Sequence, residues 1–227
     1  SALKSNTTGD NNTAVGFCSL KSNTTGDNNT AVGFESLCSN TATGNTSVGR
    51  QSMCSNTTGA DNVAMGINAL KFNTTASCNT AIGSASLKSN TTAVCNTAVG
   101  FYALCSTTTG FRNTAVGANS LCTNTTGQNN AAFGVRALEV ATTANNNVSI
   151  GSQTMRSTTS GGCNTAVGYA AMNSNTTGYN LVAVGCGALD SNTTGSQSVA
   201  IGFRSLCSNT EGFKNVAIGQ CALLNNT

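Results

Sequence analysis

The segment Asn29-Thr30-Ala31-Val32-Gly33, followed by Phe34-Glu35-Ser36-Leu37, decides the fold because close variants of it recur along the whole chain. Thirteen glycines close the motif, each 17 residues after the previous one except for a single step of 16: Gly16, Gly33, Gly49, Gly66, Gly83, Gly100, Gly117, Gly134, Gly151, Gly168, Gly185, Gly202 and Gly219. A short, constant period is typical of a solenoid, whose repeats bury their apolar residues only by stacking. The sequence predicts a single repeat domain over residues 1–227.

Aligning the repeats on the glycine separates columns of constant chemistry. The residue before the glycine, as at Val32, is large and apolar, and the residue four positions after it, as at Leu37, is Leu or Met. We expect both columns to be buried, facing each other across a narrow core. Thr30 lies two residues before Val32 and therefore on the same side of a strand. The small residue between them, Ala31, is expected on a tightly packed outer face.

A helical solenoid does not fit these columns, because the apolar residues do not recur at intervals of three and four and β-branched residues dominate the first segment. Two short strands per coil fit better, with corners at the motif glycine and at stretches such as Ser22–Gly26. Asn29 and its equivalents are expected to stack as a ladder of amides. The predicted fold is an all-β parallel β-solenoid (β-roll) of about thirteen 17-residue coils.

Two repeats carry a resemblance to known families. Ser198-Val199-Ala200-Ile201-Gly202 and Asn215-Val216-Ala217-Ile218-Gly219 resemble the repeat of YadA-like trimeric autotransporter adhesin heads. The full unit with its Ser-Asn-Thr-Thr-Gly corner also resembles repeats of phage and virus tail-fibre proteins. The resemblance implies a left-handed parallel β-roll, often trimeric, that works as a surface fibre or adhesin. The longer turn and the many cysteines of this chain depart from the adhesin pattern.

Eleven cysteines occupy a few columns of the repeat. Coils stacked about 4.8 Å apart would bring cysteines of one column in successive coils within the Cα separation of roughly 4.4–6.8 Å that a disulfide needs. We therefore predict three disulfides: Cys38–Cys54, Cys78–Cys95 and Cys105–Cys122. The alternative is free thiols. Metal binding is less favoured, since the chain has no histidine and no C-x-x-C spacing.

Other columns suggest contacts between subunits. Cys18 and Cys221 share a column near opposite ends of the chain, so head-to-tail stacking of copies could bring them together. Bulky residues follow the motif glycine in every second coil and are either lateral contacts or caps over the corner: Phe34, Ile67, Phe101, Val135, Tyr169 and Phe203. The expected partner is thus the chain itself.

Asn-Thr-Thr sequons recur at one corner of the repeat. The candidate glycosylation residues are Asn6, Asn23, Asn56, Asn73, Asn90, Asn124, Asn175 and Asn192. Glycans could attach to these residues if the protein passes a eukaryotic secretory route. A composition rich in Asn and Thr also produces such sequons without glycosylation.

Composition leaves little basis for chemistry. Charged residues make up 7% of the chain, the net charge is +3 and histidine is absent, so neither a nucleic-acid footprint nor an activated nucleophile is recognisable. We expect no catalysis and no cofactor. No apolar run is long enough to span a membrane. The expected location is extracellular, on a cell surface or on a virion.

Three functions are consistent with these features. The first is a structural subunit of a filament stapled by disulfides, and the second is an adhesin or tail-fibre shaft that binds a receptor or glycan. The third is ice binding by stacked threonines such as Thr24-Thr25 and Thr57-Thr58. Against ice binding, these threonines lie at a corner, and no Thr-x-Thr strand face is apparent.

Overall fold

The computed structural model describes residues 1–226, and these contain strands and turns but no helix. Each motif forms one strand of three residues: β1 (Thr13–Val15), β2 (Thr30–Val32), β3 (Thr46–Val48), β4 (Val63–Met65), β5 (Thr80–Ile82), β6 (Thr97–Val99), β7 (Thr114–Val116), β8 (Ala131–Phe133), β9 (Val148–Ile150), β10 (Thr165–Val167), β11 (Val182–Val184), β12 (Val199–Ile201) and β13 (Val216–Ile218). The all-β parallel solenoid predicted from the 17-residue period is confirmed.

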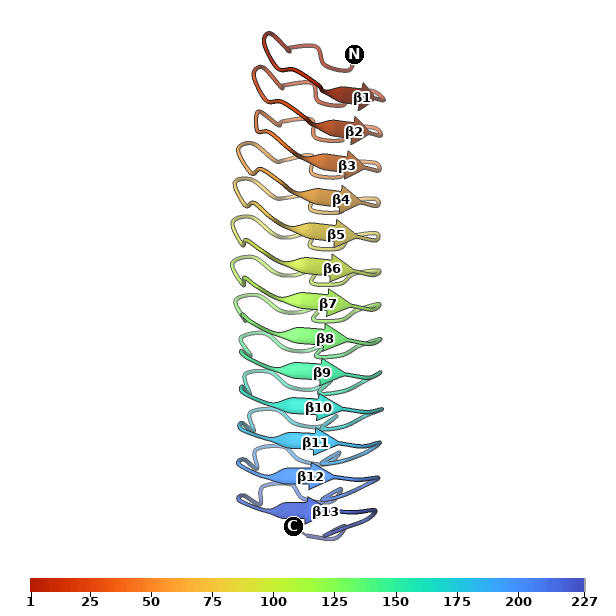
Figure 1. The fold of residues 1–227 in the computed structure, drawn as a ribbon, viewed down its shortest axis with the longest axis vertical. Helices are drawn as coiled ribbons and strands as arrows, with labels where there is room; N and C mark the ends of the chain where they lie inside the picture. The colour runs from red at the N-terminus through yellow and green to blue at the C-terminus, as the bar shows by residue number, and fades with distance from the viewer. Residues whose placement is uncertain (227) are drawn as a thin grey trace. The chain divides into compact units, whose positions relative to one another are not determined.

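The chain forms two compact units, Ser1–Arg112 with β1 to β6 and Asn113–Thr227 with β7 to β13. Within each unit, consecutive strands pair in parallel and without a register shift, so that Thr30 lies between Thr13 and Thr46. Figure 1 shows the resulting stack of coils in each unit. The expectation of a single domain stays a prediction.

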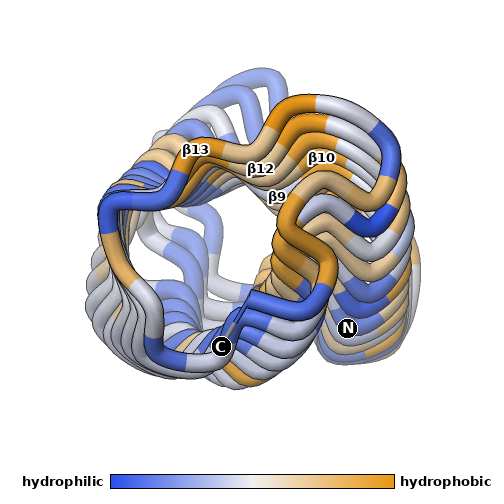
Figure 2. The backbone as a smooth tube through the Cα atoms, turned by 90° about the horizontal axis from the view of Figure 1, so that it is seen from below, coloured by the Kyte–Doolittle hydropathy of each residue, from blue (hydrophilic) through white to orange (hydrophobic). Residues whose placement is uncertain are grey.

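The strands face the opposite way from the prediction. The central residue of a strand, Ala31 for example, is 0% exposed, whereas Val15 and Ile82 before the motif glycine are 57% and 38% exposed. Viewed along the stack, each strand forms part of one wall of its coil (Figure 2). The interior behind this wall has room only for Ala or Ser. The period of two was therefore correct, but the inward phase assigned to Val32 and its equivalents was wrong.

The leucine column is buried as predicted, with Leu37 and Leu87 fully enclosed. It does not lie in a second strand, however. Glu35 and Leu37 have φ angles of 52° and 49°, in the left-handed region, and this alternation recurs in the other coils. A strand needs extended backbone, so only one strand forms per coil, and the expected second strand is wrong.

The motif glycine is required by both backbone angle and space. Gly33 has a φ of 138°, which side-chain-bearing residues rarely adopt, and a Cβ at this position would lie 2.5 Å from the carbonyl oxygen of Gly49. Each coil therefore turns tightly at the end of its strand and closely approaches the next coil.

The asparagine ladder is confirmed. Asn62 accepts a hydrogen bond on Oδ1 from the Asn79 backbone N–H at 2.9 Å and donates from Nδ2 to the Ala76 carbonyl at 2.9 Å. Equivalent asparagines repeat these bonds in both units. Because Asn62 is fully buried, the ladder satisfies backbone groups that water cannot reach.

A second ladder runs through the asparagines of the Ser-Asn-Thr-Thr-Gly corner. Asn73 donates to Asn56 Oδ1 at 2.7 Å and to the Ala76 carbonyl at 2.9 Å, while Asn90 donates to Asn73 Oδ1 at 2.8 Å. The Ala76 carbonyl thus accepts from both ladders. Sequence reasoning placed these asparagines at a surface corner and missed this role.

Substitutions at two neighbouring positions test the phase of the strand. Ala81→Leu is expected to destabilise the protein by about 1–3 kcal/mol or more, because added methylene groups overpack a filled interior. Ile82→Ala, at an outward-facing position, should change stability by only about 0.5 kcal/mol. Thermal unfolding followed by circular dichroism measures both, and the reverse order of effects would contradict the orientation described here.

Removing one member of the second ladder should be costly. In Asn73→Ala, the side-chain Nδ2 of buried Asn90 and the side-chain Oδ1 of Asn56 each lose a hydrogen-bond partner. The expected cost is about 1–3 kcal/mol for each unpaired group. Thr75→Ala changes an exposed side chain of the same corner and is the control.

Asn73→Thr should be milder than Asn73→Ala, because a threonine hydroxyl can accept from the asparagine of the next coil, as Thr158 Oγ1 does from Asn175 Nδ2 at 3.4 Å. Urea unfolding measures all three variants. Equal stability of Asn73→Ala and the control would show that the ladder contributes nothing.

Candidate binding surfaces

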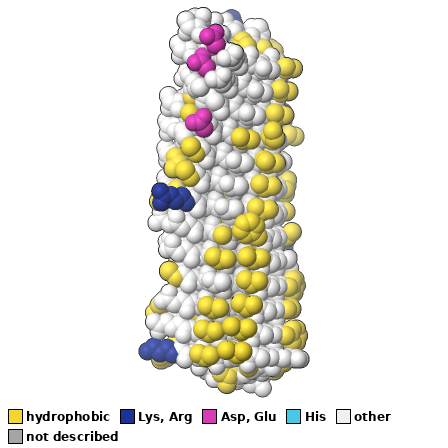
Figure 3. All heavy atoms as spheres, in the orientation of Figure 1, with side chains coloured by type: hydrophobic (Ala, Val, Ile, Leu, Met, Phe, Trp, Pro, Cys, Tyr) yellow, Lys and Arg dark blue, Asp and Glu magenta, His cyan; other side chains and the backbone are white. Residues whose placement is uncertain are grey.

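The main exposed feature is the outer sheet face, which consists of the first and third residues of each strand. In the first unit these residues are mostly Thr and Val. In the second unit Val and Ile predominate, as at Val148 and Ile150, which are 37% and 42% exposed. Figure 3 shows hydrophobic side chains gathered in columns over the strands. Neither column contains a charged residue.

The bulky residues after the motif glycine are also exposed, as an intersubunit role would require. Phe34, Ile67, Phe101, Tyr169 and Phe203 all lie at the corner next to the outer sheet face, each with its side chain about half exposed. Phe34 stacks on Phe17 of the preceding coil, with ring centroids 5.6 Å apart. Packing over the corner therefore occurs for this pair, and the lateral contact stays a prediction.

Within residues 1–226, no disulfide joins any of the eleven cysteines. The strand register nevertheless places predicted partners in one column of successive coils: Cys38 with Cys54 and Cys78 with Cys95. Cys105 and Cys122 belong to different units, as do Cys18 and Cys221. The disulfides and the link between copies stay predictions.

The thiols of the first three coils form a group. Burial raises the pKa of Cys38, and the neighbouring Cys18 adds to this effect. Burial likewise raises the pKa of Cys54, with Cys38 as the next contributor. Cys38 therefore lies near the thiols of both Cys18 and Cys54. The sequence predicted an intersubunit contact for Cys18 and did not predict that it neighbours Cys38. Since a raised pKa lowers the thiolate fraction, Cys38 and Cys54 should react slowly.

The sequon asparagines belong to the second ladder, and this placement counts against glycosylation of the folded protein. Asn23, Asn56, Asn73, Asn90, Asn124, Asn175 and Asn192 have no exposed surface. A glycan on any of these amides would have to occupy the interior of the coil. Asn6 differs, because its side chain is exposed. Among the eight candidates, only Asn6 presents its side chain to a modifying enzyme in the folded state.

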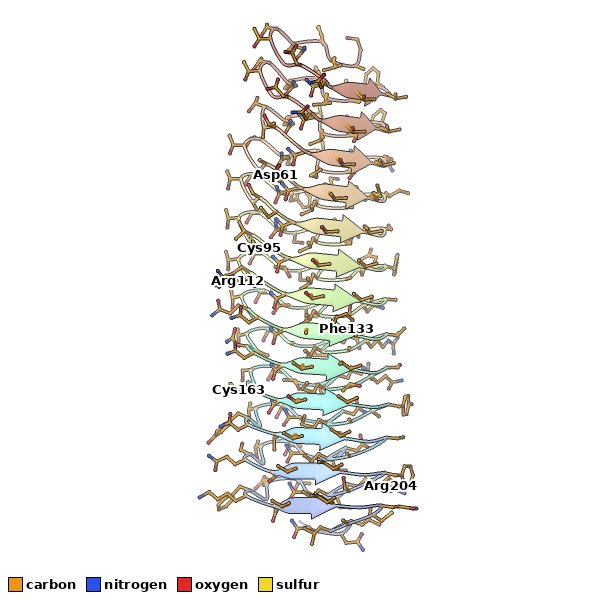
Figure 4. The ribbon with its side chains drawn as sticks, in the orientation of Figure 1. Asp61, Cys95, Arg112, Phe133, Cys163 and Arg204 are labelled. Carbon is orange, nitrogen blue, oxygen red and sulfur yellow. The ribbon has the colours of Figure 1, made fainter. Side chains whose placement is uncertain are left out.

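Charged groups lie at the turns, away from the outer sheet face. Figure 4 shows Asp61, Cys95, Arg112 and Cys163 at turns that precede strands, and Arg204 at a turn that follows one. Glu139 pairs with Arg156, with Nε and Oε2 2.7 Å apart. Within residues 1–226, no three acidic or cysteine residues gather in a way that could hold a metal ion.

Comparison with protein-family models, curated proteins and solved structures finds no match to this chain. The described residues contain no pocket. No helix among them is both long and apolar enough to cross a membrane. A function therefore has to be argued from the exposed surface and its repeat.

Mild oxidation should distinguish the cysteine columns. Cys78 and Cys95 are exposed, and their column geometry fits a disulfide, so oxidised glutathione should link them readily while Cys38 and Cys54 react more slowly. Mass spectrometry of the digested protein identifies the linked peptides, with Cys78→Ser as the control. Preferential linkage of other cysteines would contradict the predicted pairing.

Proposed function

We propose that the chain is a structural, non-enzymatic β-solenoid that associates laterally with copies of itself through the outer sheet face of the second unit. The observation that carries this proposal is the apolar, uncharged surface over β9, β11, β12 and β13. In these four strands both outward residues are Val or Ile. β11, β12 and β13 are adjacent, and contiguous exposed apolar surface of this kind is typical of a contact with another macromolecule.

Burying the part of this face over β11, β12 and β13 has no polar side-chain cost, whereas Thr165 of β10 places one hydroxyl between β9 and β11. Val and Ile carry no hydrogen-bonding side chain, and the strand backbone groups already pair along the sheet. β-Branched side chains also have little rotamer freedom to lose in a contact. Desolvation of the face is therefore favourable, at about 25 cal/mol for each Å² of apolar surface removed from water.

A second copy is the partner whose shape fits best. The side chains repeat at the strand separation, about 4.8 Å, and another solenoid of the same sequence has the same repeat. Tyr169 and Phe203 at the adjoining corner extend the apolar surface. A filament or fibre built this way is consistent with the adhesin-like and tail-fibre-like repeat, and an extracellular or virion-surface location rests on that resemblance. Head-to-tail stacking through Cys18 and Cys221 is a separate part of the proposal.

Analytical ultracentrifugation tests the lateral contact. The 22.7 kDa chain should sediment as an oligomer. Ile201→Lys places a charge on the outer sheet face and should weaken association roughly tenfold or more, because the ammonium group would be desolvated in the contact. Circular dichroism establishes that the variant is folded.

Gln197→Lys is the matched control, since it adds the same charge at an exposed turn outside the outer sheet face. It should sediment like the unaltered protein. A monomeric unaltered protein, or equal weakening by both substitutions, would contradict the proposed contact.

A further inference from the structure

The outer sheet face of the first unit has a different chemistry from that of the second. Five of its six strands begin with threonine, and all six end with a large apolar residue: Thr13 and Val15, Thr30 and Val32, Thr46 and Val48, Val63 and Met65, Thr80 and Ile82, Thr97 and Val99. We call this surface the Thr/Val face. It consists of two columns, one in which five of the six side chains carry a hydroxyl group and one that is purely apolar.

The hydroxyl groups of this face are available to solvent. Thr30, Thr46 and Thr80 are partly exposed, and their backbone N–H groups donate to the next coil. Within residues 1–226, the side-chain hydroxyls of these three threonines have no hydrogen-bond partner. The first threonine of each corner differs: Thr57 Oγ1 donates to the Thr74 carbonyl at 2.9 Å, and Thr74 repeats this bond to the next coil.

Unpaired hydroxyls determine which partner the Thr/Val face suits. A dry contact with another protein would bury them without compensation, at about 1–3 kcal/mol for each group. The absence of charge from both columns gives no attraction for nucleic acid or an anionic membrane. A partner that supplies hydrogen-bonding water at each hydroxyl avoids the burial cost.

The face is also rigid and periodic. In-register pairing from β1 to β6 repeats each column at the strand separation, which is about 4.8 Å. The two columns lie about 6.6 Å apart along each strand. β-Branched side chains hold hydroxyls and methyl groups in few rotamers. Oxygen rows in hexagonal ice repeat at a spacing close to the strand separation. Equivalent side chains of successive coils can therefore contact equivalent positions of one ice lattice.

We propose that the Thr/Val face of the first unit binds the surface of ice crystals. The threonine hydroxyls take the positions of lattice hydrogen-bond partners, while the Thr and Val methyl groups fill the spaces between ordered waters. A periodic solid matches a periodic surface at every coil, whereas most protein surfaces have no such repeat. This activity is separate from lateral association, which uses the Val and Ile residues of the second unit.

Ice-affinity partitioning and thermal hysteresis test this inference on the full chain. The unaltered protein should enter growing ice, shape the crystals and produce a hysteresis gap. Thr46→Lys and Thr80→Lys, in β3 and β5, should each lower the partition constant between ice and liquid roughly tenfold, which corresponds to about 1.4 kcal/mol. The hydrated lysine holds the flat face away from the lattice.

Thr75→Lys is the matched control, because it adds the same charge to an exposed corner threonine of the same unit. It should retain full activity. Ile201→Lys should also bind ice normally, which separates failure of self-association from failure of ice binding. Circular dichroism confirms that each variant is folded. Exclusion of the unaltered protein from ice, or equal losses in Thr75→Lys and Thr80→Lys, would overturn the proposal.

Discussion

The hydrogen bonding between successive coils is the constraint on which the rest of the structure depends. The strand contributes only three residues per coil, so the sheet alone leaves much of each coil unpaired. Backbone bonds between the turns, such as Leu37 N–H to the Ser52 carbonyl, join successive coils outside the sheet. The two asparagine ladders add side-chain bonds at buried positions and converge on the Ala76 carbonyl. Since the ladders repeat with the coil, they hold every column of the surface at the strand spacing.

The narrow interior explains why the protein exposes so much apolar surface. The residue at the strand centre is always Ala or Ser, because the space directly behind the strand admits only a small side chain. Val32 and its equivalents must therefore point outward, although such residues are usually buried. Their β-branched shape still suits a strand. The resulting face lacks both charge and flexibility, two properties that favour recognition of a regular partner.

One hydroxyl group per strand separates the two proposed binding modes. Thr30 and Val182 occupy equivalent positions in β2 and β11 and have similar shapes. The threonine needs a hydrogen-bonding partner when its face is covered, whereas the valine does not. A Thr-rich stretch thus suits ordered water, and a Val-rich stretch suits another apolar face. The same backbone can present either chemistry, because the glycine, leucine and asparagine columns determine the fold whereas the first and third strand residues determine the exposed surface.

The sequence by itself determined the period, the parallel solenoid, the buried leucines and the first asparagine ladder, because each follows from one residue type recurring at one position. It did not determine which side of a three-residue strand faces inward, since alternation has the same period in either phase. Ala31 and Val32 exchanged their predicted environments for this reason. Likewise, Asn73 matched a sequon, and only the packing of neighbouring coils placed its amide in the interior. Which side chains are buried depends on the space between the walls of the coil. That space depends on backbone conformations such as the left-handed one of Leu37, which a column of residue types does not reveal.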